Sequence, residues 1–398
     1  TFALTVNSVN DEPIATFASN PSAVNEDAGQ QTINSYVSTV NGATQLEGSQ
    51  TFTYTVTRAS GASGLFSSGP AIDANGTLTY TPLANANGST VFNVTVQDSG
   101  GTANGGDNSR TYTNQLTLTV NSVNDAPVLV DQVRDFALNE DSGTAGTAIS
   151  AFLASGSVTE VSDNVTPGTA SDNSAIEAIA ITAKSITGGT LQFSTNNGSS
   201  WTDVGAVSNT SSLLLDDSNK IRFVPSAQDF NGPAGSFTFR AWDQTTTGAG
   251  SAGTKVNTST NGGTSEFSSA TDTTSITVTS VNDEPDLTVP NRTVNEDAGA
   301  QTVGGFATTT SGAAQLEGSQ TFSYSLSNNN NALFSAQPAI APNGTLTFTP
   351  ATDAFGSATV TVNVTDSGGT ANGGDNSATR TFALPVNSVN DEPGLTVP

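Results

Sequence analysis

The chain has 398 residues with 35 acidic and 10 basic side chains, giving a formal charge of −25, and it contains no His, Cys or Met. The lack of His and Cys excludes catalytic triads, cysteine nucleophiles, zinc sites and disulfides. The acidic balance argues against nucleic acid and anionic membrane surfaces as partners, since both need a basic surface, and no apolar run is long enough to span a membrane.

Internal repeats organise the chain from its first residue. The string Val-Asn-Asp-(Glu/Ala)-Pro occurs four times, at Val9–Pro13, Val123–Pro127, Val281–Pro285 and Val389–Pro393. It predicts three complete repeats at residues 11–124, 125–282 and 283–390, with the start of a fourth at 391–398. Residues 1–7 (TFALTVN) match residues 381–387 (TFALPVN), so we expect residues 1–10 to be the last strand of a preceding repeat. Because the chain starts at Thr1 rather than Met, we expect it to be part of a larger protein.

The first repeat shows apolar residues at every second position. Three such runs are Phe52-Tyr54-Val56, Phe92-Val94-Val96 and Leu116-Leu118-Val120. Alternation with Thr and other polar residues predicts strands that are buried on one face. Asn75-Gly76 lies between two short apolar runs and predicts a tight hairpin.

The middle repeat is longer than the other two. Its extra residues lie mainly in Ala154–Ala175 and in the Gly/Ser/Thr-rich stretch Gln244–Thr274, whose composition predicts loops. Ser194–Trp201 resembles the sialidase Asp-box, with Asn196 in place of its Asp, and this motif is a structural hairpin. We therefore expect Trp201 to have a folding role, and we favour a core position for Trp242 over a sugar-binding platform.

The third repeat is a close copy of the first. It repeats the alternation at Phe322-Tyr324-Leu326 and Val360-Val362-Val364, and residues 366–377 are identical to residues 98–109. We expect this Gly-rich segment to be a flexible hairpin, with Asp107 and Asp375 near a junction. About seven strands per repeat and no helical periodicity predict an all-β fold of tandem seven-stranded Greek-key β-sandwiches. Modules of about 35 Å placed end to end would form a rod on the order of 100 Å long.

Acidic residues recur at matching positions of each repeat, although packing does not require them and clustered carboxylates repel one another. The linker positions are Asn10, Asp11, Glu12, Asn124, Asp125, Asn282, Asp283, Glu284, Asn390 and Asp391. The early-loop positions are Glu26, Glu140 and Glu296; the strand-end positions are Asp98, Asp243 and Asp366; the remaining positions are Glu47, Glu317, Asp229 and Asp353.

The Val-Asn-Asp-Glu-Pro linker, the early Glu and the strand-end Asp-x-Gly resemble extracellular cadherin repeats. They are most similar to the cadherin-like, Ig-like tandem modules of giant bacterial surface and secreted proteins. The resemblance covers all three repeats and implies Ca²⁺ at each junction, held by carboxylate, amide and carbonyl oxygens. The residues that it implies are Asn10, Asp11, Glu47 and Asp98 before the first repeat; Glu26, Asn124, Asp125 and Asp243 between the first and second; Glu140, Asp229, Asn282, Asp283, Glu317 and Asp366 between the second and third; and Glu296, Asp353, Asn390 and Asp391 after the third.

The linkers also depart from the animal cadherin pattern. Ser8, Ser122, Ser280 and Ser388 stand where that pattern has an Asp. Fewer carboxylates imply fewer or weaker ions, with dissociation constants of about 10⁻⁴–10⁻³ M. An alternative stays open, in which Asn-Asp-x-Pro is only a tight turn whose Asx side chains cap backbone amides.

The resemblance implies an extracellular or cell-surface structural and adhesive rod, stiffened by Ca²⁺, from a very large bacterial protein. Two alternatives are a subunit of a self-assembling filament or matrix, in which Gln244–Thr274 could be a lateral contact, and a carbohydrate-binding adhesin module. The expected partners are neighbouring repeats, like chains and surface glycans. We do not expect an enzyme, because the acids recur in every repeat rather than forming one site.

Overall fold

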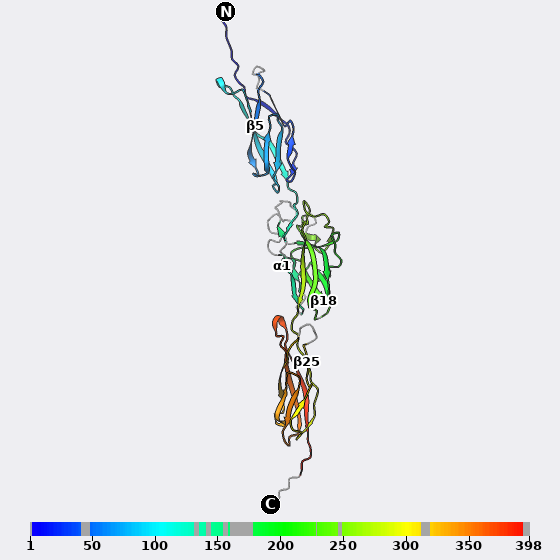
Figure 1. The fold of residues 1–398 in the computed structure, drawn as a ribbon. Coiled ribbons are helices and arrows are strands. Elements are labelled where there is room, and N and C mark those ends of the chain that lie inside the picture. Colours follow the sequence, from blue (N-terminus) through cyan, green and yellow to red (C-terminus); the bar gives the residue numbers. More distant parts are fainter. Residues whose placement is uncertain are drawn as a thin grey trace.

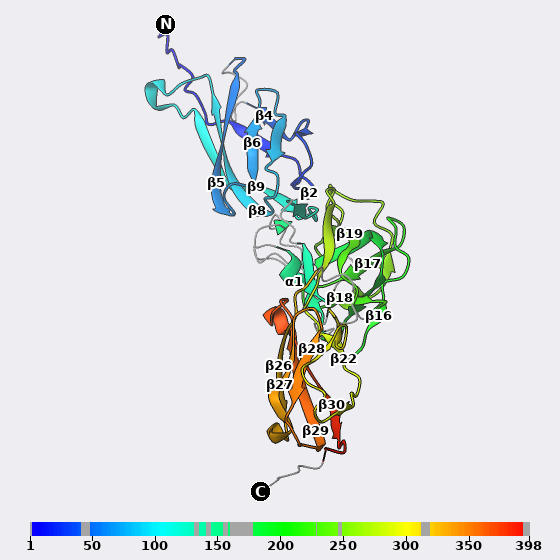
Figure 2. The same ribbon diagram turned by 60° about the horizontal axis from the view of Figure 1, so that its bottom comes forward.

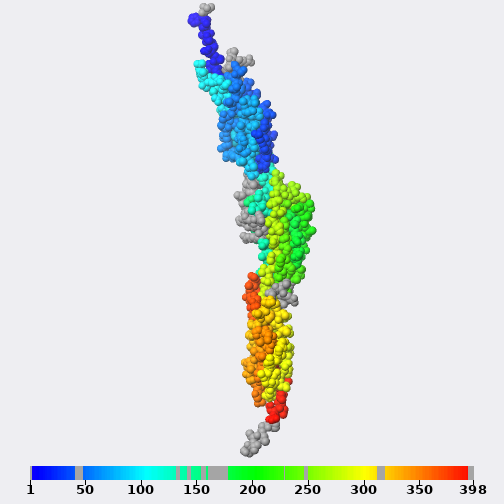
Figure 3. All heavy atoms as spheres, in the orientation of Figure 1, coloured from blue at the N-terminus to red at the C-terminus, as the bar shows by residue number. Residues whose placement is uncertain are grey.

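Three β-sandwich modules follow one another along a single line in the computed structural model, with the first and third modules at opposite ends of the molecule (Figures 1 and 2). The structure describes residues 2–40, 48–130, 135–140, 145–153, 158–159, 178–227, 229–245, 249–311 and 319–392. The space-filling view shows that the described modules meet only at their ends (Figure 3). In the described part of the chain, no helix combines the length and the apolar character needed to cross a membrane.

The first module contains two facing sheets. Its elements are β1 (Ile14–Phe17), β2 (Val24–Asn25), β3 (Gln31–Ile33), β4 (Val37–Val40), β5 (Phe52–Gly61), β6 (Phe66–Ile72), β7 (Leu78–Pro82), β8 (Gly88–Asp98), the 3-10 turn η1 (Ala103–Gly105) and β9 (Ser109–Asn121). One sheet has the order β2-β9-β8-β5, and the facing layer contains β3-β7-β6 and the pair β1-β4. Successive strands cross between the layers as in an Ig-type Greek key, which confirms the predicted fold.

The alternating runs form the strands predicted for them. Val94 and Val96 on β8 are fully buried, as is Leu116 on β9, while Thr95 between them donates to or accepts from Thr111 on the outer face at 2.9 Å. The predicted hairpin joins β6 to β7, and Gly76 has the positive φ of 79° that its turn requires. A Cβ at Gly76 would also collide with the carbonyl oxygen of Val37, so both the backbone conformation and the lack of space require glycine there.

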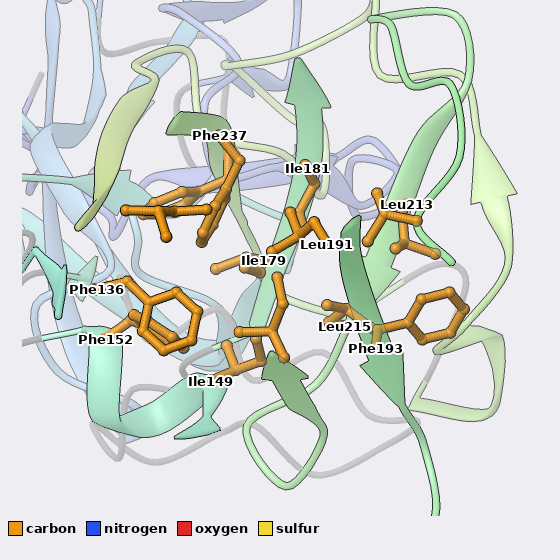
Figure 4. Close-up of a cluster of buried hydrophobic side chains, with 14 of the residues drawn as sticks. Phe136, Ile149, Phe152, Ile179, Ile181, Leu191, Phe193, Leu213, Leu215 and Phe237 are labelled. Carbon is orange, nitrogen blue, oxygen red and sulfur yellow. The ribbon is translucent and has the colours of Figure 1, made fainter. Parts of the chain in front are cut away.

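The second module keeps this plan and extends it. Its elements are β10 (Val128–Leu129), β11 (Phe136–Asn139), β12 (Thr147–Ala148), α1 (Ile149–Phe152), β13 (Val158–Thr159), β14 (Ala178–Ile186), β15 (Gly189–Ser194), β16 (Thr202–Asp203), β17 (Ser212–Leu215), β18 (Lys220–Pro225), β19 (Gly232–Trp242), η2 (Ala249–Ser251), β20 (Lys255–Val256) and β21 (Asp272–Thr279). The sheets have the orders β11-β21-β19-β14-β17-β20 and β12-β18-β15-β16, with β10 paired to β13. Phe136, Phe152 and Phe237 pack edge to face in the core between them (Figure 4).

A second apolar layer covers the outer face of this larger sheet. Trp242 is fully buried there, packed with Leu214 and with Phe267 from the long insertion. Strands β14 and β17 are therefore buried on both faces, which explains their continuous rather than alternating apolar runs. The described part of Gln244–Thr274 thus covers its own module, whereas most of Ala154–Ala175 lies outside the described residues.

The third module repeats the first. Its elements are β22 (Asp286–Thr288), β23 (Val294–Asn295), β24 (Gln301–Val303), β25 (Thr308–Thr310), β26 (Ser323–Asn328), η3 (Asn331–Leu333), β27 (Phe334–Ile340), β28 (Leu346–Pro350), β29 (Gly356–Thr365), η4 (Ala371–Gly373) and β30 (Ser377–Asn387). The sheets are β23-β30-β29-β26 and β24-β28-β27, with β22 paired to β25. The similar sequences of the first and third repeats therefore give the same strand order.

Candidate functional sites at the domain junctions

A buried glutamate of each module holds the linker that leaves it. In each case the backbone N–H of the linker valine donates to Oε1 of the glutamate. The pairs are Val123 with Glu26 at 2.7 Å, Val281 with Glu140 at 2.6 Å and Val389 with Glu296 at 2.8 Å. These glutamates are 1%, 7% and 2% exposed, respectively. Each linker therefore begins with a direct bond to the module before it.

A short strand just before the glutamate, β2 in the first module, places it beside the linker. In the first module β2 pairs in parallel with the end of β9, through Val24 with Val120 and Asn25 with Asn121. The N–H of Glu26 then donates to the carbonyl of Asn121 at 3.1 Å. The residue after β2 is thus fixed beside the point where β9 ends and the linker starts, and β23 and β30 repeat the pairing in the third module.

The surroundings of the second glutamate oxygen differ among the three junctions. Among the described residues, Oε2 of Glu26 and Oε2 of Glu296 are buried and have no well-formed hydrogen bond. At Glu26 the side chain of Asn87 is close enough to lower the pKa of this carboxyl by hydrogen bonding, whereas the structure gives Glu296 no such neighbour among the described residues. At the second junction, Asn231 donates to Oε2 of Glu140 at 3.2 Å. Because an unpartnered buried carboxylate oxygen is costly, the third site favours a bound cation most, and the first site does so less because Asn87 lies beside Glu26.

Further carboxylates gather beside Glu296 at the end of the third module. One oxygen from each of Asp297, Asp353 and Asp391 lies within 4.8 Å of the others, and all three residues are exposed. Partial desolvation raises the pKa of Asp391, and the charges of Asp353, Asp297 and Glu296 raise it further. Three or four carboxylate oxygens in such proximity offer the hard donor set that suits Ca²⁺.

The junction between the first and second modules carries a similar but smaller group. Burial raises the pKa of Glu26, and the charges of Asp125 and Asp27 add to this rise, while the Val123 N–H opposes it. Burial and then the Asp27 charge also raise the pKa of Asp125. Asn85 stands where the third module has Asp353, so this cluster has one carboxylate fewer. At the second junction, Asp229 and Asp283 are described but Asp141 is not.

The linker asparagine makes the opposite connection, to the module that follows. Its Nδ2 donates to the strand-end aspartate, in the pairs Asn10–Asp98 at 2.9 Å, Asn124–Asp243 at 3.0 Å and Asn282–Asp366 at 3.1 Å. These aspartates are buried. Burial raises the pKa of Asp243, and the nearby charge of Glu266 raises it further. The structure therefore brings together each Asn–Asp pair that the sequence assigned to a common junction.

Other predicted positions are placed differently. Glu12 forms an ion pair with Arg110 at 2.8 Å, and Glu284 lies 3.9 Å from Arg380, so an arginine faces each of these carboxylates. Asn390 donates to the carbonyl of Asp391 at 3.2 Å. Glu47 and Glu317 lie outside the described residues.

Several junction residues were not among those predicted from the sequence. Asp27 and Asp297 follow the predicted glutamates directly, and the repetition of Asn-Glu-Asp was the available signal. Gln50 and Gln320 each donate to a linker asparagine at 2.8 Å, and both end a recurring Glu-Gly-Ser-Gln string. Glu266 gave no repeat signal, because it lies in the insertion of the middle module.

The two tryptophans do not offer an open sugar platform. Trp242 is fully buried and its Nε1 donates to Oε2 of Glu266 at 3.2 Å. The Arg222 guanidinium covers the Trp201 ring at 4.1 Å from the centroid, and a Cβ at Gly146 would collide with this ring. Ser194 and Asn196 bond within the predicted hairpin at 2.8 Å, which agrees with a folding role for Trp201.

No protein-family model matches the chain, and no curated protein matches it. Solved structures of extracellular cadherin domains are similar. Protocadherin gamma B2 domains 3–6 have 14% identity and a TM-score of 0.48, with 97% of this chain and 78% of that chain covered. The protocadherin gammaB7 EC3-6 cis-dimer structure has 15% identity and a TM-score of 0.49, covering 94% and 77%. Mouse cadherin-23 EC22-24 has 15% identity and a TM-score of 0.40, covering 96% and 100%. These values are too low to transfer residue roles to this chain.

Proposed function

We propose that the chain is a segment of an extracellular structural and adhesive rod whose joints are stiffened by Ca²⁺. The observation that carries this proposal is the cluster of Asp297, Asp353 and Asp391 beside the buried Glu296, whose Oε2 has no hydrogen-bond partner among the described residues. These acids come from one module and from the linker that leaves it. A cation held by them would fix the direction in which the chain continues.

The proposed ligands lie on the preceding-module side of each joint. They are Glu26, Asp27 and Asp125 at the first joint, Glu140, Asp229 and Asp283 at the second, and Glu296, Asp297, Asp353 and Asp391 at the third. All offer oxygen atoms, which suits Ca²⁺ better than softer metals. An ion that binds only the folded joint stabilises it by about 2.7 kcal/mol when its free concentration is a hundred times the dissociation constant.

The same chemistry supports an extracellular location. Small, partly exposed carboxylate clusters suit weak sites of about 10⁻⁴–10⁻³ M, which fill at extracellular Ca²⁺ concentrations. A structural role rather than an enzymatic one is supported by the recurrence of the acids at successive joints. The sequence resemblance favours a bacterial surface protein.

Calorimetry and X-ray scattering of the full chain, with Ca²⁺ and with a chelator, test this proposal. We expect Ca²⁺ to raise the melting temperature and to keep the particle at its longest dimension. Asp297→Asn combined with Asp353→Asn should remove the part of this effect that comes from the third joint. Asp286→Asn, which changes an exposed acid outside the joints, is the matched control. Unchanged melting and dimensions on chelation would refute the role of Ca²⁺.

We also propose that residues 1–7 are the last strand of a preceding module. The described residues 2–13 form no strand here, and Phe2, Leu4 and Val6 are 103%, 87% and 85% exposed. Their sequence counterparts Phe382, Leu384 and Val386 on β30 are 2%, 0% and 2% exposed. The contrast supports a rod that continues beyond this segment by the same construction.

A further inference from the structure

The following-module side of each joint differs from the glutamate side, because the linker asparagine uses its whole side chain in hydrogen bonds. Asn10 Nδ2 donates to Oδ1 of Asp98 at 2.9 Å and to the carbonyl of Asp107 at 2.8 Å. Its Oδ1 accepts from Nε2 of Gln50 at 2.8 Å, and its backbone carbonyl accepts from the N–H of Asp107 at 2.9 Å. Both side-chain donors and the side-chain acceptor therefore have partners.

The third module builds the same arrangement from residues at matching positions. Asn282 Nδ2 donates to Asp366 Oδ1 at 3.1 Å and to the Asp375 carbonyl at 2.8 Å. Its Oδ1 accepts from Gln320 Nε2 at 2.8 Å, and its carbonyl accepts from the Asp375 N–H at 2.8 Å. We call each such set, Asn10 or Asn282 with its aspartates and glutamine, an asparagine clasp.

The Gly-rich loop, whose twelve residues are identical in the two modules, closes each clasp. A Cβ at Gly100 would overlap the Asn10 side chain, and a Cβ at Gly368 would overlap that of Asn282. A Cβ at Gly374 would lie 2.9 Å from the Asn282 carbonyl oxygen. In Figure 1 the loop that carries η4 lies at the end of the third module that faces the second. The loop therefore packs against the linker asparagine, whereas its composition predicted a flexible hairpin.

The aspartate of each clasp accepts hydrogen bonds from the linker asparagine and from a loop glycine. Oδ1 of Asp98 accepts from both Asn10 and the N–H of Gly100, the latter at 2.9 Å, and Asp366 repeats this with Gly368 at 2.9 Å. Such donors stabilise a buried carboxylate. Both oxygens of Asp366 contact Asn282 Nδ2, at 3.1 and 3.4 Å. Oδ2 of Asp98 is buried and has no partner among the described residues, so the hydrogen bonds of the aspartate are complete only in the Asn282 clasp.

We propose that the asparagine clasp is an ion-free lock, and that metal acts only on the glutamate side of each joint. The second half of this statement rests on the proposed Ca²⁺ function, whereas the first does not. Chelation would then release each joint on one side: the linker would loosen from the preceding module and stay fixed to the following one.

The second module carries an incomplete clasp, which gives an internal comparison. Asn124 Nδ2 donates to Asp243 and, at 3.2 Å, to the carbonyl of Ser265 from the insertion. Among the described residues, however, Oδ1 of Asn124 is buried and none donates to it as Gln50 donates to Asn10. We therefore expect the linker to be held less firmly at Asn124 than at Asn282.

Hydrogen exchange of the full chain, followed by mass spectrometry with Ca²⁺ and with a chelator, tests the proposal. Chelation should speed exchange of the Val281 and Val389 N–H groups, which donate to glutamates, by about tenfold or more. The Asp107 and Asp375 N–H groups, which donate to Asn10 and Asn282, should keep their rates. An equal increase at Asp375 and Val281 would overturn the proposal, because the clasp would then depend on the ion.

Variants of the clasp test whether it holds without an ion, separately from the effect of Ca²⁺ on the glutamate side. Gly368→Ala should speed exchange at Asp375 even when Ca²⁺ is saturating. Gln320→Ala should have a weaker effect in the same direction, and it replaces the glycine variant if that variant does not fold. Gly304→Ala is the control, since a Cβ there meets nothing within 4 Å. If Ca²⁺ has no effect on any joint, the proposed function fails, but protection of Asp375 that is lost in Gly368→Ala still supports the ion-free clasp. Unchanged exchange in both clasp variants would overturn it.

Discussion

The backbone N–H of Val281 donates to Oε1 of Glu140 at 2.6 Å, although the two residues are 141 positions apart in the chain. The contact is buried, so the backbone N–H at the start of this linker has a hydrogen-bond acceptor in the second module. Removal of the acceptor should therefore leave a buried N–H without a partner.

Glu140→Ala should lower the free energy of unfolding of the full chain by about 1–3 kcal/mol in the presence of a chelator. Glu140→Gln keeps an oxygen acceptor for Val281 and should cost less than about 1 kcal/mol, but it should lose the response of that joint to Ca²⁺. Denaturant unfolding with and without Ca²⁺ measures both effects. Equal destabilisation by the two variants would contradict the assigned hydrogen bond.

The dependence of stability on pH should also change with Ca²⁺. The pKa values of Glu26, Asp125 and Asp391 are raised above their usual values, chiefly by desolvation and then by neighbouring acids. The folded joint therefore binds protons more tightly than the unfolded chain does, and stability contributed by these groups rises as the pH falls through their raised pKa values. In chelator we expect stability to increase from pH 7 toward the upper end of the usual carboxylate range. With Ca²⁺ bound the trend should weaken or reverse, because protons then compete with the ion. Unfolding curves at several pH values would show a flat profile in chelator if these acids were unperturbed.

The hairpin between β6 and β7 should depend on one glycine. Gly76→Ala places a side chain at φ 79° and against the carbonyl of Val37, so we expect a loss of about 1–3 kcal/mol in the free energy of unfolding. Gly29→Ala is a matched control, because a Cβ at Gly29 meets nothing within 4 Å. Thermal melting of the two variants should separate them clearly.

The same substitution should have a much smaller effect in the exposed N-terminal segment than in its buried copy. Phe382→Ala should destabilise the third module by about 3–5 kcal/mol, because Phe382 lies in its core. Phe2→Ala should change the stability of this chain by less than about 0.5 kcal/mol. In a chain extended by the preceding residues, Phe2→Ala should cost as much as Phe382→Ala does here. A negligible effect in the extended chain would refute the assignment of residues 1–7 as a strand.

The insertion of the second module should contribute to stability rather than to contacts between chains. Phe267→Ala should cost about 3 kcal/mol, since its side chain is 4% exposed and packs in the cluster around Trp242. Phe355→Ala is the control, because that ring is 64% exposed. Native mass spectrometry of the Phe267 variant should show the same association state as the unaltered chain.

The repeats and the strands that are buried on one face could be predicted because both leave a regular pattern along the chain. Leu116 and Leu118 alternate with polar residues and are buried as expected. Leu213, Leu214 and Leu215 gave no such pattern, since the insertion covers the second face of β17. A local pattern cannot show that a distant loop supplies a second core.

The joint residues were only partly predictable for a related reason. Recurring acids identified Glu26 and Asp98, but the partners of Asn10 depend on loops that return to it from 40 to 97 positions away. Gly100 is conspicuous in the sequence only as a flexible residue. Glycine is required there because a Cβ would overlap the Asn10 side chain, and no spacing along the chain reveals this contact.

Val123 bonds to the module before it and Asn124 to the module after it, so the two anchoring points of this linker are consecutive residues. Consecutive Cα atoms are about 3.8 Å apart, and this distance cannot stretch. A pulling force along the rod would therefore meet no slack between modules. It would pass directly into the hydrogen bonds of the anchoring side chains and, once these break, into the strands themselves, so the rod should resist extension until a joint opens or a module unfolds.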